Sequence, residues 1–371
     1  MLVDIKIEVI KFSQKILRID WLIILLSFCL IFMGCIALYS AAGGDWYPWA
    51  FLHFQRGMLG IFIAIFIAFI DIKVIYKFAW LPLIIIIFLL LFLHFTGVNS
   101  VNRWIDLGVI SLQPSELAKV AIVLALARFF HDIPFRDQGK ILYYIVAIIL
   151  IAPVIFLTMI QPDLGTSIMQ TLILASIIFL AGIRVWVIIL SLTIFISSLP
   201  IIWFQLHNYQ KLRILTLLDP SRDILGSGYH ITQSKIALGS GGVFGKGFLM
   251  GTQSHLNFLP EKHTDFVFTM LGEEFGLLGG IIIIFLFFIL IAYAFAISIF
   301  QTSQFGRLLC SGLAFLIFTY VFVNIGMVSG IIPVVGAPLP LISYGGTSML
   351  TIFVCIGLVM SASINRNIPL N

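Results

Sequence analysis

Long uninterrupted apolar runs constrain this chain more than any other feature of its sequence. Ten such segments can be counted, at 21–41, 54–70, 79–97, 115–131, 141–159, 164–183, 185–204, 276–300, 307–328 and 345–364. A helix needs about 20 apolar residues to cross a bilayer, whereas a membrane barrel strand needs about ten residues of alternating polarity. The sequence therefore predicts an all-α integral membrane protein with about ten transmembrane helices.

The composition agrees with this prediction. Of the 371 residues, 61% are hydrophobic and only 10% are charged, whereas about a quarter of the residues in a soluble domain are charged. The first apolar run is longer than the roughly 7–15 residues of a signal peptide, so we expect it to be an uncleaved first span. We expect one polytopic membrane domain over residues 1–371, with a large outer loop at about 205–275 between the seventh and eighth spans.

The charges predict the orientation of the chain. Twelve lysines and arginines fall on the same side of the membrane as the N-terminus. On the opposite side, outside the long loop, there are three: Arg56, Arg103 and Lys119. The positive-inside rule then places both termini in the cytoplasm. Ten of the sixteen acidic residues fall on the outer side. The polar chemistry is therefore expected at the outer face, and no hydrophilic cytoplasmic domain is predicted that could bind a nucleotide or nucleic acid.

The densest polar cluster is Glu261, Lys262, His263, Thr264 and Asp265, within FLPEKHTDFVF just before the eighth span. Thr264 or Asp265 could cap the next helix, which would explain one polar residue but not five. Asp265 and Glu273 are eight residues apart, so an uninterrupted helix would place both on one face.

A zinc site in this stretch is disfavoured. Zinc-binding histidines on a helix are typically four residues apart, with a third ligand nearby. His255 lies eight residues before His263, and Pro260 would break any helix between them.

A second cluster, NRWIDLG followed by QPSELAK, surrounds the start of the fourth span. Glu116 and Lys119 share a helix face and can form an ion pair inside the bundle, or both can extend to the lipid headgroups. Trp104 either faces a site or belongs to the interfacial aromatic belt. Asp163, in QPDLGTS, is either a helix cap at a tight turn or a functional acid.

The glycine-rich run GSGGVFGKGF resembles a phosphate-binding loop but does not match the Walker pattern. Gly247 follows Lys246 where that pattern requires Ser or Thr, and the first glycine is replaced by Ser240. Its backbone amides could still approach an anion, or the run could be a flexible turn.

Taken together, these motifs resemble the SEDS family (shape, elongation, division and sporulation), and its elongation branch most of all. The matching segments cover essentially the whole chain: NRWIDLG, QPSELAK, QPDLGTS, LDPSRDILGSGYHITQSKIALGSGGVFGKGF, SHLNFLPEKHTDFVFTMLGEEFG and GAPLPLISYGGTS. The resemblance implies a peptidoglycan glycosyltransferase that polymerises lipid II, the undecaprenyl-diphosphate disaccharide-pentapeptide, at the outer face of the bacterial cytoplasmic membrane. It also implies a class B penicillin-binding protein, a transpeptidase, as partner within the elongation machinery.

The family's essential aspartate falls on Asp265, and its other sensitive positions on Trp104, Glu273, Glu116 and Lys119. Inverting glycosyl transfer needs one base to take the proton of the attacking hydroxyl, and the resemblance assigns this role to Asp265. The pKa of Asp265 could be raised by burial or lowered by a neighbouring lysine, and the sequence does not decide between them.

The departing diphosphate needs positive charge. The candidates are Arg103, Lys119, Lys246 and Lys262, or a divalent cation such as Mg²⁺ or Mn²⁺. Asp163, Lys262, His263 and Thr264 are supporting candidates for substrate binding. Two alternatives to the polymerase are a flippase or transporter of the same lipid and a non-catalytic scaffold for the transpeptidase.

Overall fold

Each of the ten apolar segments forms a helix. The structure, a computed structural model, describes residues 12–96, 103–106, 111–134, 137, 139–223, 226–252 and 261–370. The corresponding helices are α2 (Trp21–Ala41), α3 (Trp49–Ala68), α5 (Leu81–Thr96), α6 (Pro114–Asp132), α7 (Ile141–Ile160), α8 (Leu164–Leu180), α9 (Val185–Gln205), α13 (Val267–Ile299), α14 (Gln304–Val328) and α15 (Gly346–Ile364).

Short elements connect these helices. The helical ones are α1 (Phe12–Leu17), α4 (Ile72–Lys77), α10 (Asn208–Leu218), the 3-10 turn η2 (Pro220–Asp223) and α11 (Ser227–Ser240). Two short strands, β1 (Ile105–Asp106) and β2 (Ser111–Leu112), pair antiparallel ahead of α6.

The helices have the lengths and composition of a multi-pass membrane protein, as predicted. Within the described residues, seven are long and apolar enough to cross a membrane: α2, α3, α7, α9, α13, α14 and α15. Two others, α5 and α8, are apolar but shorter. The tenth, α6, contains Glu116, Lys119, Arg128 and Asp132. Such charges are costly in lipid, so α6 needs a protein environment.

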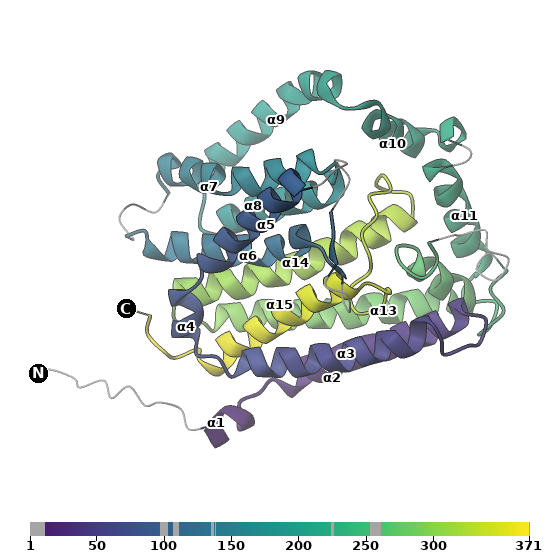
Figure 1. The fold of residues 1–371 in the computed structure, drawn as a ribbon, viewed down its shortest axis with the longest axis horizontal. Coiled ribbons are helices and arrows are strands. Elements are labelled where there is room, and N and C mark those ends of the chain that lie inside the picture. The colour runs from purple at the N-terminus through teal and green to yellow at the C-terminus, as the bar shows by residue number, and fades with distance from the viewer. Residues whose placement is uncertain are drawn as a thin grey trace, which may run out of the picture.

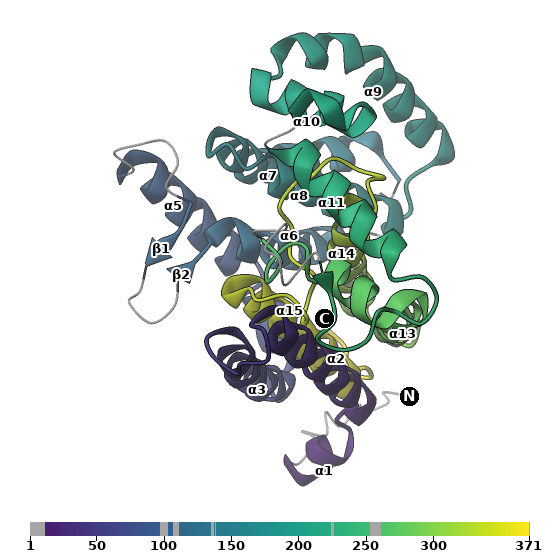
Figure 2. The same ribbon diagram turned by 90° about the vertical axis from the view of Figure 1, so that its right-hand side faces the viewer.

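The centre of the bundle consists of α6, α14 and α15. Residues Ala118 to Ala127 of α6 are all buried, and 78% of the most apolar stretch of α14 and of α15 is buried. By contrast, α9 buries only Val187. Figures 1 and 2 show α9 and α10 at the edge of the molecule, farthest from α2 and α3. The outward faces of the peripheral helices are apolar, as a lipid environment requires.

The two ends of the described chain lie on the same side of the bundle. Figure 1 shows α1, α4 and the C-terminal end together at the left, whereas α11 and the start of α13 lie at the right. An even number of spans gives this arrangement. It is consistent with the predicted topology, although which side faces the cytoplasm stays a prediction.

The expected large segment lies between α9 and α13, as predicted, and much of it is helical; only its C-terminal bound at 275 was wrong. It contains α10, η2 and α11, and its last residues already belong to α13, which begins at Val267 rather than at 276. Position 276 marks a break instead: Gly276 has non-helical dihedrals (φ 66°, ψ −162°). Hydropathy missed the first part of α13 because Glu273 and Glu274 lie in it.

Candidate active site

Asp265 lies in a tight turn, residues 261–266, directly before α13. The backbone amides of Thr264 and Phe266 donate to the carbonyl oxygen of Glu261 at 3.2 and 3.3 Å. The Thr264 hydroxyl donates to the Glu261 carboxylate at 2.8 Å. Neither Thr264 nor Asp265 caps α13 with its side chain, so the alternative that one of them is a helix cap was wrong. Since Asp265 precedes the helix, the expectation of one shared helix face with Glu273 was wrong as well.

The surroundings of Asp265 settle the direction of its pKa shift. Burial, and secondarily the negative charge of Glu261, raises the pKa of Asp265 to about 6. A carboxylate with this pKa is mostly ionised at neutral pH and still accepts a proton better than an ordinary aspartate. Both properties are needed in a general base that works near pH 7.

Three other parts of the chain hold this turn in place. The Tyr344 amide donates to the carbonyl oxygen of His263 at 2.9 Å, and the Asn324 side chain donates to the carbonyl oxygen of Asp265 at 2.9 Å. The His263 ring stacks on Trp49, with centroids 4.5 Å apart and planes 8° apart. Burial lowers the pKa of His263, so its ring is neutral at pH 7. The turn is therefore a fixed element.

Lys262 is the most enclosed of the turn's five polar residues. It is 8% exposed, and burial lowers the pKa of its ammonium group. Its neighbour Glu261 is exposed. The turn thus combines a buried lysine and an exposed carboxylate in the residues that precede Asp265.

A polar cavity of about 310 Å³ is joined to this turn through Tyr344. It is lined by Arg56, Trp104, Ser111 and Gly346. The Arg56 guanidinium lies over the Tyr344 ring, 4.6 Å from its centroid, and Tyr344 also contacts the turn through His263. Trp104 is half exposed and faces this cavity, which favours a role at the site over membership of the aromatic belt alone.

Arg56 is a residue that the sequence reasoning missed as a site residue. We counted it only as one of three exceptions to the positive-inside rule. Its signal was its place inside the apolar segment 54–70, because a charge within a span marks a functional site by default. Arg56 also borders a narrow apolar hollow of about 120 Å³ between α3 and α15, where Leu59, Ile63 and Met349 line the wall.

Arg103 and Asp163 both fix the turn between α7 and α8. Arg103 donates to the carbonyl oxygens of Gln161 and Pro162 at 2.8 and 2.6 Å. The Asp163 carboxylate accepts from the amide of Thr166 at 3.2 Å and so caps α8. Of the two interpretations left open for Asp163, the structure confirms capping.

Glu116 and Lys119 form the predicted ion pair inside the bundle. Lys119 is fully buried and Glu116 is 7% exposed, and the Lys119 Nζ atom lies 2.7 Å from a Glu116 carboxylate oxygen. Tyr320 of α14 completes the cluster: it accepts from Lys119 at 2.7 Å and donates to Glu116. This confirms pairing over extension to the headgroups. The cluster joins α6 to α14.

Glu273 is buried on α13 and holds a different loop. Its carboxylate accepts from the Lys246 ammonium at 2.7 Å, the Thr252 amide at 2.9 Å and the Thr252 hydroxyl at 3.0 Å. His255 and Pro260, which follow Thr252, lie outside the described residues. Glu273 thus anchors the segment that leads toward the Asp265 turn.

The glycine-rich run packs against the break in α13. The amides of Lys246 and Gly247 donate to the carbonyl oxygens of Glu273 and Glu274, each at 3.0 Å. A Cβ atom on Gly245 would lie 2.1 Å from the Glu274 carbonyl oxygen. These amides bind backbone and not an anion. The run is a docked turn that needs glycine for close approach.

We therefore predict that Gly245→Ala destabilises the protein more than Gly242→Ala. Both glycines have positive φ, at +81° and +55°, so both substitutions strain the backbone. Only the alanine at 245 would also collide with α13, since nothing lies within 4 Å of a Cβ on Gly242. Overpacking typically costs about 1–3 kcal/mol. Thermal unfolding in detergent should show a lower midpoint for Gly245→Ala, and equal midpoints would contradict this docking.

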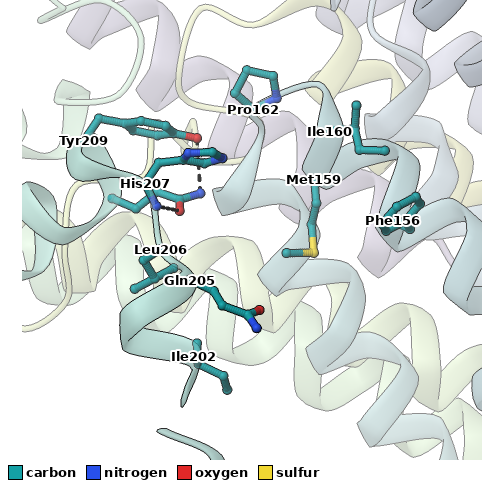
Figure 3. A pocket seen from close by; sticks show the side chains of 10 residues that line it. Phe156, Met159, Ile160, Pro162, Ile202, Gln205, Leu206, His207 and Tyr209 are labelled. Carbon is teal, nitrogen blue, oxygen red and sulfur yellow. Dashed lines mark hydrogen bonds between the residues drawn. The ribbon is translucent and has the colours of Figure 1, made fainter. Parts of the chain in front are cut away.

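Another hollow, of about 770 Å³, lies between the α7–α8 turn and the helices α9 and α10. Figure 3 shows Phe156, Met159 and Ile160 on one wall, with His207 and Tyr209 opposite. The described residues that line it include no carboxylate, lysine or arginine. It is an apolar cavity next to the loosely packed α9 and lacks the chemistry of the Asp265 turn.

Among the described residues, no group of three or more His, Cys, Asp or Glu side chains could hold a metal ion. The divalent cation stays a prediction. Of the predicted site residues, the structure places Trp104 at the polar cavity with Arg56, and the Asp265 turn reaches that arginine through Tyr344. The structure places Glu116 and Lys119 in the bundle interior, Glu273 at the glycine-rich turn, and Arg103 with Asp163 at the α7–α8 turn.

The chain is similar to known proteins over nearly its whole length. The family described as FTSW_RODA_SPOVE, cell cycle protein, matches residues 20–368. The chain is 40% identical over 358 residues to "Peptidoglycan glycosyltransferase MrdB" of Escherichia coli K12, a match that covers 94% of both proteins.

Solved structures agree in fold. One, described as "Structural coordination of polymerization and crosslinking by a peptidoglycan synthase complex", contains a chain that matches with a TM-score of 0.81 and 29% identity, over 94% of this chain and 98% of that one. The crystal structure of the rod shape determining protein RodA of Thermus thermophilus matches with a TM-score of 0.70 and 26% identity, over 95% and 98%.

Proposed function

The chain belongs to the family of cell cycle proteins that comprises FtsW, RodA and SpoVE, and from this premise we propose that it polymerises lipid II with Asp265 as general base. Its activity is that of a peptidoglycan glycosyltransferase of cell elongation and rod-shape maintenance. One observation carries the role of Asp265. It is a largely enclosed carboxylate on a fixed turn, with its pKa raised to about 6, and Tyr344 joins that turn to the arginine of a polar cavity.

In the proposed reaction, Asp265 accepts the proton of the acceptor sugar hydroxyl. The hydroxyl oxygen attacks the anomeric carbon of the donor and forms the new glycosidic bond with inversion. The bond from that carbon to the diphosphate breaks, and the lipid diphosphate leaves with the electron pair. Because the diphosphate is a good leaving group, one carboxylate suffices, unlike the two that glycosidases use.

Arg56 is the best-supported group for binding the diphosphate. It lines the polar cavity, whereas Lys119 and Lys246 are each held by a carboxylate within their own clusters. Arg103 donates to backbone carbonyls, and Lys262 remains a second candidate. The apolar hollow beside Arg56 supports this assignment, because a lipid tail could extend from the diphosphate between α3 and α15. A bound Mg²⁺ or Mn²⁺ would add positive charge to the same group.

The chain is a multi-pass membrane protein. We place it in the bacterial cytoplasmic membrane with cytoplasmic termini and with Asp265 at the outer face. A class B penicillin-binding protein is the proposed partner, since one similar solved structure is described as a complex of polymerization and crosslinking. A general base at the outer face that acts on a membrane-bound sugar donor agrees with such a partnership.

We predict that polymerisation of lipid II loses rate below about pH 6. The base works when ionised, and the raised pKa of Asp265 moves its protonation from near 3.8 up to about 6. The rate should therefore fall about tenfold per pH unit below that point and be constant near neutrality. Glu261→Gln should move this acid limb to lower pH, because Glu261 contributes to raising the pKa. A rate that is constant down to about pH 4.5 would remove the basis for this assignment.

We also predict that Arg56→Gln lowers kcat/KM for lipid II by roughly 10- to 100-fold, mainly through KM. Charged hydrogen bonds typically contribute about 1.5–3 kcal/mol, and glutamine keeps a polar group without the charge. Arg222→Gln is the matched control, since Arg222 pairs with Asp219 on the exposed turn η2. An unchanged KM in Arg56→Gln would assign the diphosphate to another cation.

A further inference from the structure

Asn324 is a buried amide that bridges two irregular segments. It lies in α14 and is fully buried. Its Nδ2 group donates to the carbonyl oxygen of Asp265 at 2.9 Å and to that of Ala337 at 2.7 Å. Both hydrogens of the amide are thus used, one on the Asp265 turn and one on the segment that leads to α15.

The second segment also borders the Asp265 carboxylate. A Cβ atom on Gly336, which has a positive φ of +77°, would lie 3.4 Å from the Asp265 Oδ2 atom. Asn324 therefore ties together the backbone that carries the carboxylate and the backbone that forms part of its wall. Loss of either hydrogen bond would let the two segments move apart.

The helix that carries Asn324 is itself fixed one turn earlier. Tyr320 lies four residues before Asn324, hence on the same face of α14. It contacts both Glu116 and Lys119 of α6. The buried ion pair thus sets the position of the helix from which Asn324 reaches the turn.

The Oδ1 atom of Asn324 is buried and has no hydrogen-bond partner among the described residues. An unpaired buried acceptor is unfavourable and offsets part of what the two donated bonds contribute. The amide is therefore a poor source of net stability. The direct effect of its two hydrogen bonds is to place the carbonyl groups of Asp265 and Ala337.

We propose that Asn324 is a positioning residue, which holds the Asp265 turn against the segment at 336–337 so that the carboxylate faces the acceptor hydroxyl. The inference rests on the function proposed above. The hydrogen bond from Asn324 to residue 265 reaches its backbone carbonyl oxygen, and Asn324 takes no part in proton transfer. Misplacement of a reacting group by about 1 Å can cost roughly 100-fold in rate.

Other charged and titratable groups around the turn would respond to the same movement. They are Glu261, Lys262 and His263 on the turn itself, and His230 on α11, whose ring lies 5.7 Å from that of Phe266. A loosened turn is better hydrated, and hydration favours the ionised form of a carboxylate.

The test is Asn324→Leu, which keeps the branched shape of the side chain and removes both donors. Asn365→Leu is the matched control: Asn365 is also buried, donates to the carbonyl oxygen of Ser361 at 2.8 Å and has an unpaired Oδ1 atom, but lies at the end of α15. Per folded molecule, we expect Asn324→Leu to lower kcat for lipid II about 10- to 100-fold. Its KM should stay within about twofold, its acid limb should move to lower pH, and Asn365→Leu should match the wild type.

Hydrogen exchange gives a readout that does not depend on activity. In Asn324→Leu, the amides of residues 261–266 should exchange faster, while α2 and α3 stay unchanged. Normal exchange in the turn, or a kcat equal to that of Asn365→Leu, would overturn the positioning role. Wild type and Asp265→Asn belong in the same assay. If Asp265→Asn is active while Asn324→Leu loosens the turn, the base assignment fails, but the structural role of Asn324 in holding the turn is retained.

Discussion

Purified Asp265→Asn should lose polymerisation of lipid II by roughly 10²- to 10⁴-fold while remaining folded. Asparagine has nearly the shape of aspartate but cannot accept the proton, and general-base catalysis typically contributes a factor of this size. The hydrogen bond from Asn324 reaches the backbone of residue 265, so the substitution leaves it in place. The measurement is glycan formation per folded molecule at pH 7.5.

Asp45→Asn is the control for this experiment. Asp45 is another aspartate of the predicted outer side, exposed between α2 and α3, and its substitution should leave the rate unchanged. Polymerisation at the wild-type rate by Asp265→Asn would contradict the base assignment. Normal cell growth with the inactive variant at normal protein level would instead support the scaffold alternative.

The second large effect is expected from Lys119→Met. This substitution leaves Glu116 buried without its cation, and breaking a buried ion pair by removing one partner costs about 3–5 kcal/mol. Lys119 is fully enclosed, so solvent offers little compensation. Thermal unfolding in detergent should show a large drop in the midpoint and a lower yield of folded protein.

The double variant Glu116→Gln with Lys119→Met separates charge from packing. It removes both charges, and Tyr320 can still donate to the glutamine carbonyl in place of the carboxylate. We expect it to recover most of the stability lost in Lys119→Met, because no unpaired charge remains buried. If the double variant is less stable than Lys119→Met, the interaction between the two side chains is not the one described.

Apolar length was enough to predict the helices, because a chain in lipid must satisfy its backbone hydrogen bonds within each span. The Glu116–Lys119 pair was also predictable, because two opposite charges three residues apart on one helix face can neutralise each other. The start of α13 was not predictable from hydropathy. Its first turns contain Glu273 and Glu274, whose burial depends on Lys246 and on Ser40 of α2, both distant in sequence.

The candidate site was harder to predict, because contacts between distant segments build it. The resemblance singled out Asp265, but the local sequence suggested a helix cap where the structure has a turn held by Asn324 and Tyr344. Arg56 was overlooked because its role depends on meeting Trp104 and Gly346, from other parts of the chain. The glycine-rich run left an anion site and a flexible turn both open, because its docking against Gly276 cannot be inferred from either segment alone.

The most direct test of the central claim follows lipid II in vesicles that contain the purified chain. Two products are measured in one sample: glycan polymer, and lipid II moved from one leaflet to the other. We predict that polymer forms, and that it is absent with Asp265→Asn. Movement of lipid II between leaflets without any polymer, in the wild type and with its partner transpeptidase present, would contradict the polymerase and favour a lipid transporter.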